Sequence, residues 1–409
     1  MTEQNIHVVV YGATSFVGQI VCRYFMDTYG VDGQVKWAMA GRSQEKLEAL
    51  RSEFGAQGAS IPLMQADAFD ATALKNMCDK TQVVLSTVGP YALYGEELIK
   101  ACVEAGTDYV DLTGEVPWMR DMLDKYEAAS KQSGARLIHC CGFDSIPSDL
   151  GVWHLQHAAR AKHGQACHKV HYRLKAAKGG WSGGTVASLL NVAKNAGQDA
   201  SMRKILADPY ALCSDSNKAD TKQHEVVWAE HDDHLDQWIG PFVMAGINTR
   251  VVHRSNQLSD FDYGQDFQYD EAVITGHGSK GWLLAQSLVT GMAGFLLSVA
   301  VGPTRWLLQS FVLPKPGQGP SPEAQESGFF NVLMYGETPS GETITTKVTG
   351  DRDPGYGSTA KMIAEAALCL SHDVSKSEIP GGFWTPSTAL GSRLLERLEA
   401  NAGVRFELI

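Results

Sequence analysis

Residues 6–18 read IHVVVYGATSFVG, and this stretch decides the predicted fold of the N-terminal third of the chain. Ile6–Tyr11 is an apolar, β-branched run of the kind that forms a buried strand. Phe16–Tyr29 carries apolar residues at helical spacing, and a glycine-containing loop lies directly between the two segments. A strand, a tight turn and a helix in this order form the unit that binds the pyrophosphate of a dinucleotide.

The loop has the residue types that phosphate binding requires. Gly12 is expected to make the turn that lets the backbone approach a pyrophosphate, and Gly18 to let the helix pack close to the sheet. Ser15 replaces the middle glycine of the commoner motif, and its hydroxyl can donate a hydrogen bond to phosphate. Free N–H groups and a partial positive charge at the helix N-terminus complete the site. The predicted phosphate-binding residues are Gly12, Thr14, Ser15, Phe16, Val17 and Gly18.

Strand-like and helical segments alternate from about residue 6 to residue 140. This predicts an α/β fold, a Rossmann-type doubly wound parallel sheet with helices on both faces. The further strands are expected at Val35–Ala40, Ile61–Gln65, Gln82–Thr87, Tyr109–Leu112 and Ala135–His139. The rhythm changes after Gly142. The expected domains are therefore a dinucleotide-binding domain (1–144), an α+β domain (145–350) and a C-terminal segment with two helical stretches (351–409).

The end of the second strand indicates which dinucleotide is bound. NAD-binding domains usually carry an acidic residue here to hold the ribose 2′-hydroxyl, but this chain has Arg42 and Ser43. Arginine pairs with a 2′-phosphate through its fork of donors, so NADPH is the predicted cofactor. The alternative is that Arg42 is a solvated loop residue and that the cofactor is NAD.

Later strand ends contribute further candidates, because ligands collect at the carboxyl edge of such sheets. Asp67 and Ala68 end the third strand and are expected to border the adenine. The turn after the fourth strand is expected under the nicotinamide, and its residues are Thr87, Val88, Gly89 and Pro90. Tyr91 and Tyr94 follow this turn, and a phenol there could donate a proton to the substrate. The alternative roles are packing for Tyr91 and helix capping for Tyr94.

Composition limits the classes of function. The formal net charge of −11 argues against a nucleic-acid binder, and no pair of the eight cysteines has CxxC spacing, which favours reduced thiols in a cytoplasmic protein. Residues 1–5 lack the features of a secretory signal. Residues 230–234 have metal-ligand types without the spacing of a known site, so no metal is expected. Four more carboxylates lie at strand ends: Asp111, Glu115, Asp144 and Asp149, the last expected to begin a helix.

The segment 281–313 is unusually apolar for an acidic chain. Residues 281–304 carry no charge over a length that could span a bilayer, but three glycines and Pro303 interrupt them. Lys280 and Arg305 flank the run on both sides, so the flanks set no orientation. Three interpretations stay open: a helical hairpin that dips into a membrane surface, the wall of a channel for a lipid substrate, or a buried dimer or core helix.

Motifs along nearly the whole chain resemble those of the saccharopine dehydrogenase-like family, and more narrowly its trans-acting enoyl reductase branch. They lie at Gly12–Gly18, Ala40–Ser43, Thr87–Tyr91, Gly106–Glu115 (GTDYVDLTGE), Gly142–Gly151 (GFDSIPSDLG), Ser182–Thr185 and Asp353–Thr359. The resemblance implies that the second domain is inserted and that the C-terminal helices return to the Rossmann domain. It carries over no settled catalytic motif, and the cluster of basic residues that an amino-dicarboxylate substrate would need is not found.

Residues and resemblance together lead us to expect an NADPH-dependent oxidoreductase that reduces a lipid-like or polyketide-like substrate, for instance at an enoyl C=C bond. We expect a cytoplasmic homodimer that meets the inner face of a membrane through residues 281–313. Two alternatives stay open. One is a dehydrogenase of the same fold that acts on a small soluble carbonyl or imine, and the other is a non-catalytic, lipid-associated nucleotide-binding protein.

Overall fold

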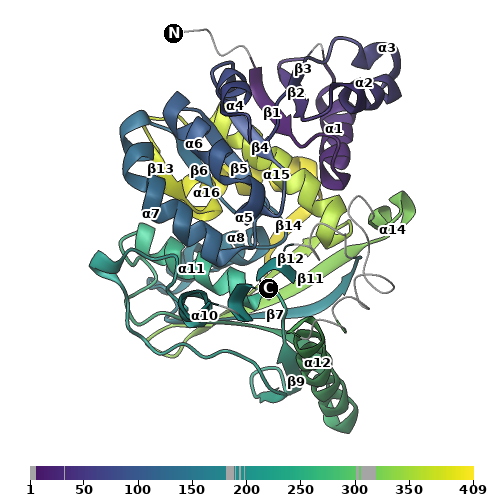
Figure 1. Ribbon diagram of the computed structural model, residues 1–409. Coiled ribbons are helices and arrows are strands. Elements are labelled where there is room, and N and C mark those ends of the chain that lie inside the picture. Colours follow the sequence, from purple (N-terminus) through teal and green to yellow (C-terminus); the bar gives the residue numbers. More distant parts are fainter. Residues whose placement is uncertain are drawn as a thin grey trace. The chain divides into compact units, whose positions relative to one another are not determined.

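The computed structural model describes residues 6–31, 33–180, 188, 190–192, 195–197, 199–300, 304 and 319–409. The chain divides into two compact units. The first unit contains residues 1–146, 317–319 and 355–403, and the second contains residues 147–316, 320–354 and 404–409. The chain therefore leaves the first unit after about a third of its length and later returns to it (Figure 1). The motif Ser182–Thr185 lies outside the described residues.

The first unit is built on a parallel sheet. Its strand order is β13-β6-β5-β4-β1-β2-β3, and its neighbouring strands pair in parallel. The strands are β1 (Ile6–Tyr11), β2 (Trp37–Gly41), β3 (Leu63–Gln65), β4 (Thr81–Ser86), β5 (Asp108–Asp111), β6 (Arg136–Ile138) and β13 (Gly382–Trp384). The predicted Rossmann-type sheet is confirmed, with β13 as an additional strand. Val8, Val9 and Val10 are wholly buried, because both faces of a central parallel strand are covered.

Helices cover this sheet. They are α1 (Phe16–Tyr29), α2 (Gln44–Glu53), α3 (Gly55–Gly58), α4 (Ala71–Cys78), α5 (Tyr91–Tyr94), α6 (Glu96–Ala105), α7 (Val116–Ser133), α15 (Thr359–Leu368) and α16 (Pro386–Arg397). Helix α6 packs between α4 and α7, whereas α1 packs against α15 (Figure 1). The local sequence sets several helix starts, because Ser15, Ser43 and Asp70 each accept an N–H from the first turn of the helix that follows.

A buried carboxylate joins the C-terminal helices to α1. Glu365 of α15 is wholly buried and accepts hydrogen bonds from the hydroxyl groups of Tyr24 (2.6 Å) and Tyr29 (2.5 Å) of α1. Arg397 of α16 forms an ion pair with its second carboxylate oxygen at 3.1 Å. A buried charge is tolerated when it is paired and hydrogen-bonded, so these side chains hold α15 and α16 on α1.

The second unit is built on a mixed sheet of order β14-β12-β11-β7-β10-β9-β8. Within the described residues, β7 and β10 pair in parallel and the other neighbours are antiparallel. The strands are β7 (Lys169–Lys178), β8 (Glu230–Asp232), β9 (Gln237–Pro241), β10 (Gln268–Gly276), β11 (Phe329–Glu337), β12 (Thr343–Gly350) and β14 (Val404–Leu408). The helices are α8 (Ile146–His163), α10 (Ala200–Ala207), α11 (Ala245–Leu258), α12 (Gly278–Ala300) and α14 (Pro322–Glu326).

The C-terminal strand differs from the expectation that residues 351–409 return to the first unit. Residues 355–403 do lie in that unit, but β14 pairs with β12 in the second sheet. Val404 and Phe406 are buried, whereas Arg405 between them is exposed. This alternation is typical of a strand with one covered face, and it places the last residues in the second unit.

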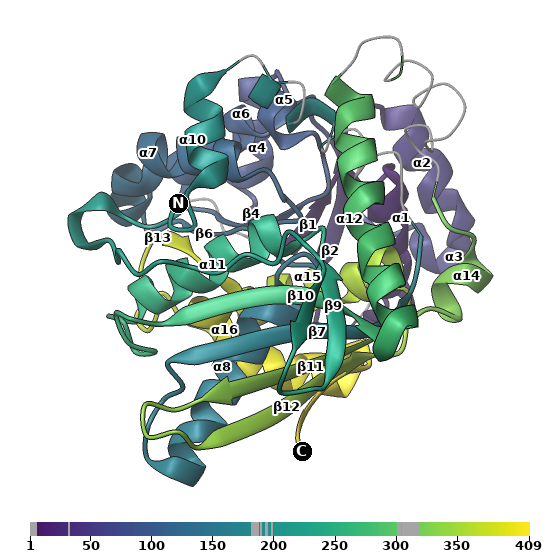
Figure 2. The same cartoon turned by 90° about the horizontal axis from the view of Figure 1, so that it is seen from below.

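Helix α12 contains the described part of the apolar segment, and residues 301–303 and 305–313 lie outside the description. Gly278–Val299 are long and apolar enough to cross a membrane, and 11% of their most apolar window is buried. One edge of α12 packs on β9, where Ala285 is wholly buried beside Gly240 (Figure 2). Large apolar side chains elsewhere on the helix are exposed: Trp282, Leu283, Leu284, Leu296 and Leu297. The described part of α12 is therefore not a core helix of this chain.

Candidate functional site

The loop after β1 has a backbone that only glycine fits. Gly12 has a φ of +85°, and its N–H donates to the carbonyl of Ala40 at 2.9 Å, which joins the ends of β1 and β2. A Cβ at Gly12 would lie 2.7 Å from Cγ2 of Val88 and 2.8 Å from Oγ1 of Thr87. The turn predicted at Gly12 is present, and a side chain there would strike the loop after β4.

Gly18 brings the first turn of α1 against the same loop. A Cβ at Gly18 would lie 2.1 Å from the carbonyl oxygen of Gly12 and 2.9 Å from Cα of Ala13. Both neighbours are backbone atoms and cannot rotate away. The sequence predicted close packing of the helix on the sheet. In the structure, Gly18 closely approaches the loop after β1, residues 12–15, which is called the phosphate loop below after its predicted role.

The Ser15 hydroxyl contacts other residues of the loop, and its predicted bond to phosphate stays a prediction. Its hydroxyl oxygen accepts the N–H of Gly18 at 2.9 Å and lies 2.9 Å from Oγ1 of Thr87, which donates to the carbonyl of Gly12 at 3.1 Å. The Ser15 hydroxyl therefore braces the loop from within. Among the described residues, the N–H groups of Phe16 and Val17 have no hydrogen-bond partner, and they lie at the positive end of the α1 dipole.

The residues after β2 and β3 lie at the carboxyl edge of the first sheet. Arg42 is exposed, and its guanidinium forms no ion pair with a described residue, while Ser43 caps α2 by accepting the N–H of Lys46 at 3.3 Å. Burial and the Asp67 carboxylate raise the pKa of Tyr11, the last residue of β1, whereas the charge of Arg42 lowers it. Arg42 and Asp67 thus lie within electrostatic reach of one buried phenol. Sequence reasoning missed Tyr11, although its polar tip at a strand end was a signal.

Asp67 and Ala68 follow β3 as predicted. Asp67 is exposed, and its carboxylate accepts the N–H of Phe69 at 3.0 Å, while Ala68 is partly exposed. Phe69 is 70% exposed, and its ring centroid lies 5.8 Å from that of Tyr94. A polar turn and an exposed aromatic pair therefore border the edge on the side where the adenine is expected.

The turn after β4 is tied to the phosphate loop. The N–H of Thr87 donates to the carbonyl of Tyr11 at 2.9 Å, and Val88 contacts the space beside Gly12. The peptide bond between Gly89 and Pro90 is cis. The predicted cofactor-binding residues of the β1 and β4 loops therefore come together at one edge of the sheet.

The two predicted proton donors differ in their surroundings. Tyr91 is 5% exposed, and its phenol donates to the carbonyl of Ser86 and accepts the N–H of Leu112, both at 3.1 Å. This geometry favours a structural role, in which Tyr91 joins the ends of β4 and β5. Tyr94 is 36% exposed and contacts Phe69, so its predicted catalytic role stays a prediction.

Asp111 at the end of β5 organises the loop after β6. Its Oδ2 lies 2.7 Å from Nδ1 of His139, and its Oδ1 accepts the N–H groups of Thr113 and Cys140, each at 3.1 Å. Glu115 acts in the same way at the start of α5, where it accepts two N–H groups at 2.9 and 3.0 Å. Both carboxylates are buried with their oxygens occupied, which indicates a structural role.

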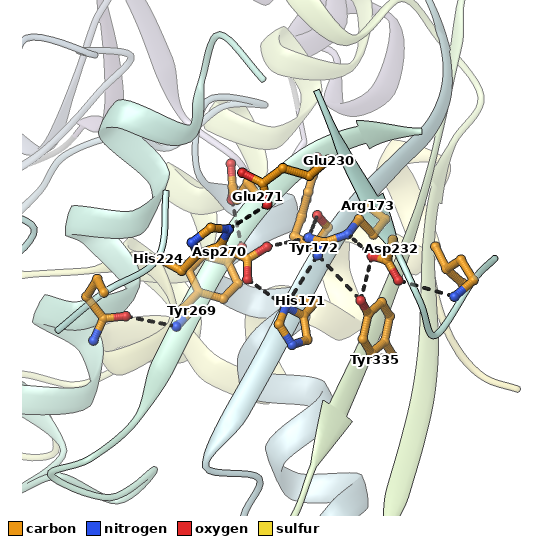
Figure 3. A network of polar contacts seen from close by, with 12 residues as sticks. His171, Tyr172, Arg173, His224, Glu230, Asp232, Tyr269, Asp270, Glu271 and Tyr335 are labelled. Carbon is orange, nitrogen blue, oxygen red and sulfur yellow. Dashed lines mark hydrogen bonds and ion pairs between the residues drawn. The ribbon is translucent and has the colours of Figure 1, made fainter. Parts of the chain in front are cut away.

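A second polar cluster lies on one face of the sheet in the second unit (Figure 3). Arg173 of β7 donates to Asp232 at 2.6 Å and to Asp270. Tyr335 donates to Asp232 at 2.6 Å, and Nδ1 of His171 lies 2.6 Å from Asp270. Although burial opposes it, the hydrogen bonds from Tyr335 and Arg173 hold the pKa of Asp232 low, and those from His171 and Arg173 do the same for Asp270.

Glu271 neighbours Asp270 in sequence but faces the other side of the sheet. It is 1% exposed and accepts hydrogen bonds from the phenol of Tyr269 at 2.6 Å and the side-chain amide of Asn248 at 2.9 Å. Burial without a cation raises the pKa of Glu271 to about 7. Within the part of the chain that is described, no group of three or more His, Cys, Asp or Glu side chains is arranged to hold a metal ion.

The edge of the first sheet fits a dinucleotide with a 2′-phosphate. The glycine turn gives the backbone room, and the open N–H groups of Phe16 and Val17 suit a pyrophosphate. Arg42 offers a cation that forms no ion pair with any described residue. These observations concern different atoms of the segments that follow β1 and β2. They lie at the ends of β1 and β2, where the sequence predicts phosphate binding.

Comparison with known proteins agrees with this geometry. Residues 8–138 match the family described as the saccharopine dehydrogenase NADP binding domain. A protein of Mycobacterium tuberculosis, named provisionally as a trans-acting enoyl reductase, is 38% identical, and the match covers 99% of this chain and 98% of that protein. The trans-acting enoyl reductase of Mycobacterium bovis is 36% identical, with 98% and 97% covered. Saccharopine dehydrogenase (L-Glu forming) of Saccharomyces cerevisiae aligns with a TM-score of 0.52 and 13% identity over 98% of this chain and 99% of that one.

The fold, the phosphate loop and the matching NADP-binding domain define an oxidoreductase that uses NADP(H). Within that class, the chain belongs to the trans-acting enoyl reductase family, because relatives of that name match it over nearly its full length. The resemblance seen in the sequence motifs and the predicted NADPH cofactor are both confirmed. The yeast enzyme shows a shared fold, which extends over both units.

Proposed function

We propose that the protein uses NADPH to reduce the C=C bond of an enoyl group on a lipid-like or polyketide-like substrate. The observation that carries the proposal is the full-length similarity to proteins named trans-acting enoyl reductases, at 36–38% identity. When bound, NADPH supplies the hydride. The phosphate loop and Arg42 hold its phosphates, and the turn Thr87–Pro90 supports the nicotinamide at the carboxyl edge of the sheet.

We further propose that the protein works in the cytoplasm at the inner face of a membrane and meets that membrane through α12. Large exposed apolar side chains lie near both ends of α12, at Trp282–Leu284 and at Leu296 and Leu297, and Lys280 is its only charged residue within the described range. So many exposed large apolar side chains on one helix are unusual on a protein that stays in water. A tryptophan near one end suits the boundary between lipid and water. A long acyl substrate would be reached from the same membrane.

The enzymatic proposal is tested by incubating the protein with NADPH and α,β-unsaturated acyl thioesters of increasing chain length. NADPH absorbance should fall, and mass spectrometry should find the saturated product, with kcat/KM rising with chain length. Turnover of small aldehydes, ketones or imines in place of enoyl thioesters would instead establish a soluble-substrate dehydrogenase. Cofactor binding without turnover of any of these would leave a nucleotide-binding protein that is not a reductase of this class.

The membrane proposal is tested by flotation with liposomes that contain anionic lipid. The wild type should float, and a variant with the exposed leucines Leu283, Leu284, Leu296 and Leu297 changed to Ser should stay in the dense fraction. Because these side chains are exposed, the variant should keep its thermal stability and NADPH affinity. Leu408→Ser with Ile409→Ser, two exposed apolar residues elsewhere, is the matched control and should float like the wild type. A wild type that stays in the dense fraction refutes the proposal, and sedimentation then tests the predicted homodimer.

A further inference from the structure

Asp144 lies at the edge of the first sheet where the cofactor loops meet. In a parallel sheet all strands end at the same edge, and the loops after β1, β4 and β5 begin with Gly12, Thr87 and Leu112. Asp144 belongs to the loop that follows β6, next to β5 in the sheet. Its charge also acts on the phenol of Tyr91, which is bonded to the ends of β4 and β5. Asp144 is thus placed beside the expected nicotinamide half of the site.

The loop that carries Asp144 is held firmly. Cys140 has a φ of +61°, which is strained for a residue other than glycine, and its N–H is held by Asp111 at 3.1 Å. The N–H of Phe143, directly before Asp144, donates to Oγ1 of Thr359 at 3.0 Å. After Asp144, the N–H groups of Ser145 and Ile146 donate to the carbonyl of Gly142 at 3.3 and 2.9 Å. A backbone fixed on both sides presents the Asp144 carboxyl in a defined position, and strained backbone such as that at Cys140 clusters at functional sites.

The Asp144 side chain differs from the other acids at this edge. It is partly exposed, and within the described part of the chain no side chain or N–H group bonds to its carboxyl. Burial, together with the negative charge of the neighbouring Asp111, raises the pKa of Asp144 to about 7. Among the described residues, its charge also acts on Tyr91 and Cys140, both buried acids whose own pKa values are raised by burial. Near neutral pH, a substantial fraction of Asp144 therefore carries a proton.

We propose that Asp144 is the catalytic acid that donates the proton of the reduction. The proposal rests on the proposed enoyl reduction. A hydride with its electron pair, supplied by NADPH, goes to the alkene carbon farther from the acyl carbonyl, and the C=C electrons move to the adjacent carbon. The O–H bond of Asp144 breaks as a C–H bond forms on that adjacent carbon. The carboxylate then regains a proton from water, so one hydride and one proton have been added to the substrate.

The neighbouring candidates suit this step less well. Tyr91 uses its phenol proton in a bond to a carbonyl, and Asp111 has its carboxylate oxygens occupied by His139 and two N–H groups. Tyr94 contacts Phe69, which follows β3 at the adenine side of the sheet. Asp144 differs from these groups because its carboxyl is partly exposed, holds a proton near neutral pH and has no bonding partner among the described residues. Acids with perturbed pKa values of this type are typical of catalytic sites.

The test is the isosteric variant Asp144→Asn, measured with the enoyl thioester that the wild type reduces best. We expect kcat to fall roughly 100-fold or more, which is the usual contribution of a general acid. The dissociation constant for NADPH should change by less than about twofold, since no phosphate contact is lost. For the wild type, kcat/KM should decline as pH rises through about 7, where Asp144 loses its proton. For the variant, this decline should be absent.

One further measurement tests Asp144 independently of the proposed function. The infrared carboxyl band of Asp144, assigned by its loss in Asp144→Asn, should disappear with a midpoint near pH 7, and this readout needs no substrate. Asp124→Asn on the exposed face of α7 is the matched control and should match the wild type in every assay. An Asp144→Asn variant with wild-type kcat and an unchanged pH profile, or a carboxyl that titrates near pH 4, overturns the proposal. A wild type that reduces no enoyl thioester overturns the proposed function and this step with it, whatever the infrared midpoint.

Discussion

The carboxyl edge of the first sheet and the polar face of the second sheet hold charged groups in opposite ways. At the edge, Arg42 and Asp144 have no bonding partner among the described residues, and the helix N–H groups beside Ser15 are also open. On the second sheet, Arg173 and the acids around it satisfy one another and are buried. Open polar groups in a folded protein are available to a ligand, whereas groups that satisfy one another serve the architecture. The difference separates the nucleotide site from a cluster that is equally rich in charge.

The largest effect on NADPH binding should come from a side chain that fills the space at the predicted phosphate loop. Gly18→Ala places a methyl 2.1 Å from the carbonyl oxygen of Gly12, so the phosphate loop must move. We expect NADPH binding, followed by fluorescence titration, to become unmeasurable. Gly246→Ala adds a methyl that meets nothing within 4 Å and serves as the control, which should bind normally. Normal binding by Gly18→Ala would mean that the phosphates lie elsewhere.

The next effect should fall on stability rather than binding. Arg173→Met removes the cation from between Asp232 and Asp270, both of which are buried. Breaking a buried pair in this way typically costs about 3–5 kcal/mol of unfolding free energy. Urea denaturation should show this loss at pH 7 and a smaller one near pH 4, where the stranded acids can be protonated. NADPH affinity of the folded protein should be unchanged, and a loss of affinity without a loss of stability would contradict the structural role.

Glu271 offers a smaller, pH-dependent effect on the same sheet. Its pKa is raised in the folded state to about 7 from an ordinary 4.5, so the folded protein holds a proton that the unfolded chain releases. Stability should therefore fall as pH rises from about 5 to 7, by about 3 kcal/mol for this group alone. Asp232 and Asp270 have lowered pKa values, so their contribution is lost only as pH falls below about 4.

Replacing Glu271 with Gln should flatten part of this decline in pH-dependent urea denaturation, and Asp144→Asn should remove another part. Gln is the matched replacement because it keeps the size of the side chain and an oxygen for the Tyr269 phenol. Identical pH profiles for wild type and Glu271→Gln would show that this carboxyl titrates normally in the folded protein.

The smallest effect should be a change of cofactor preference. Arg42→Ala removes the cation proposed to bind the 2′-phosphate, and a hydrogen bond to a charged group contributes about 1.5–3 kcal/mol. NADPH affinity should fall about 10- to 100-fold by titration, while NADH affinity stays within about twofold. Lys46→Ala, an exposed cation in the first turn of α2, is the control. A parallel loss for both cofactors would show that Arg42 acts on a part that NADPH and NADH share.

The sequence predicted the first unit well because its signals are local. Unbroken apolar runs such as Ile6–Tyr11 marked the parallel strands, and the glycines of the first loop marked the turn. Strand β13 (Gly382–Trp384) was not predicted, because a strand of three residues is too short to show an alternation of apolar and polar residues. Strand β14 carried an alternating pattern that was overlooked at the end of a helical stretch.

The parts that could not be predicted depend on burial and on long-range pairing. Nothing local to Asp144 distinguishes it from Asp149, because its pKa is set by the fold around it and by Asp111. Arg173 and Asp270 are 97 residues apart, and only the sheet register brings them together. The contact between the hydroxyl groups of Ser15 and Thr87 joins residues 72 positions apart, so the sequence around Ser15 did not indicate it.

The buried hydrogen bonds and ion pair at Glu365 have a consequence for the order in which the first unit is completed during translation. Tyr24 of α1 emerges early, but its partner Glu365 follows 341 residues later, and Arg397 later still. The N-terminus of α1 is the predicted phosphate-binding end, while the side chains that hold its other end, Glu365 and Arg397, belong to the final portion of the chain. A nascent chain that has completed its first six strands therefore still lacks the brace of its dinucleotide site. We therefore expect a chain that stops before residue 365 to hold α1, and the loop before it, less firmly than the full chain does.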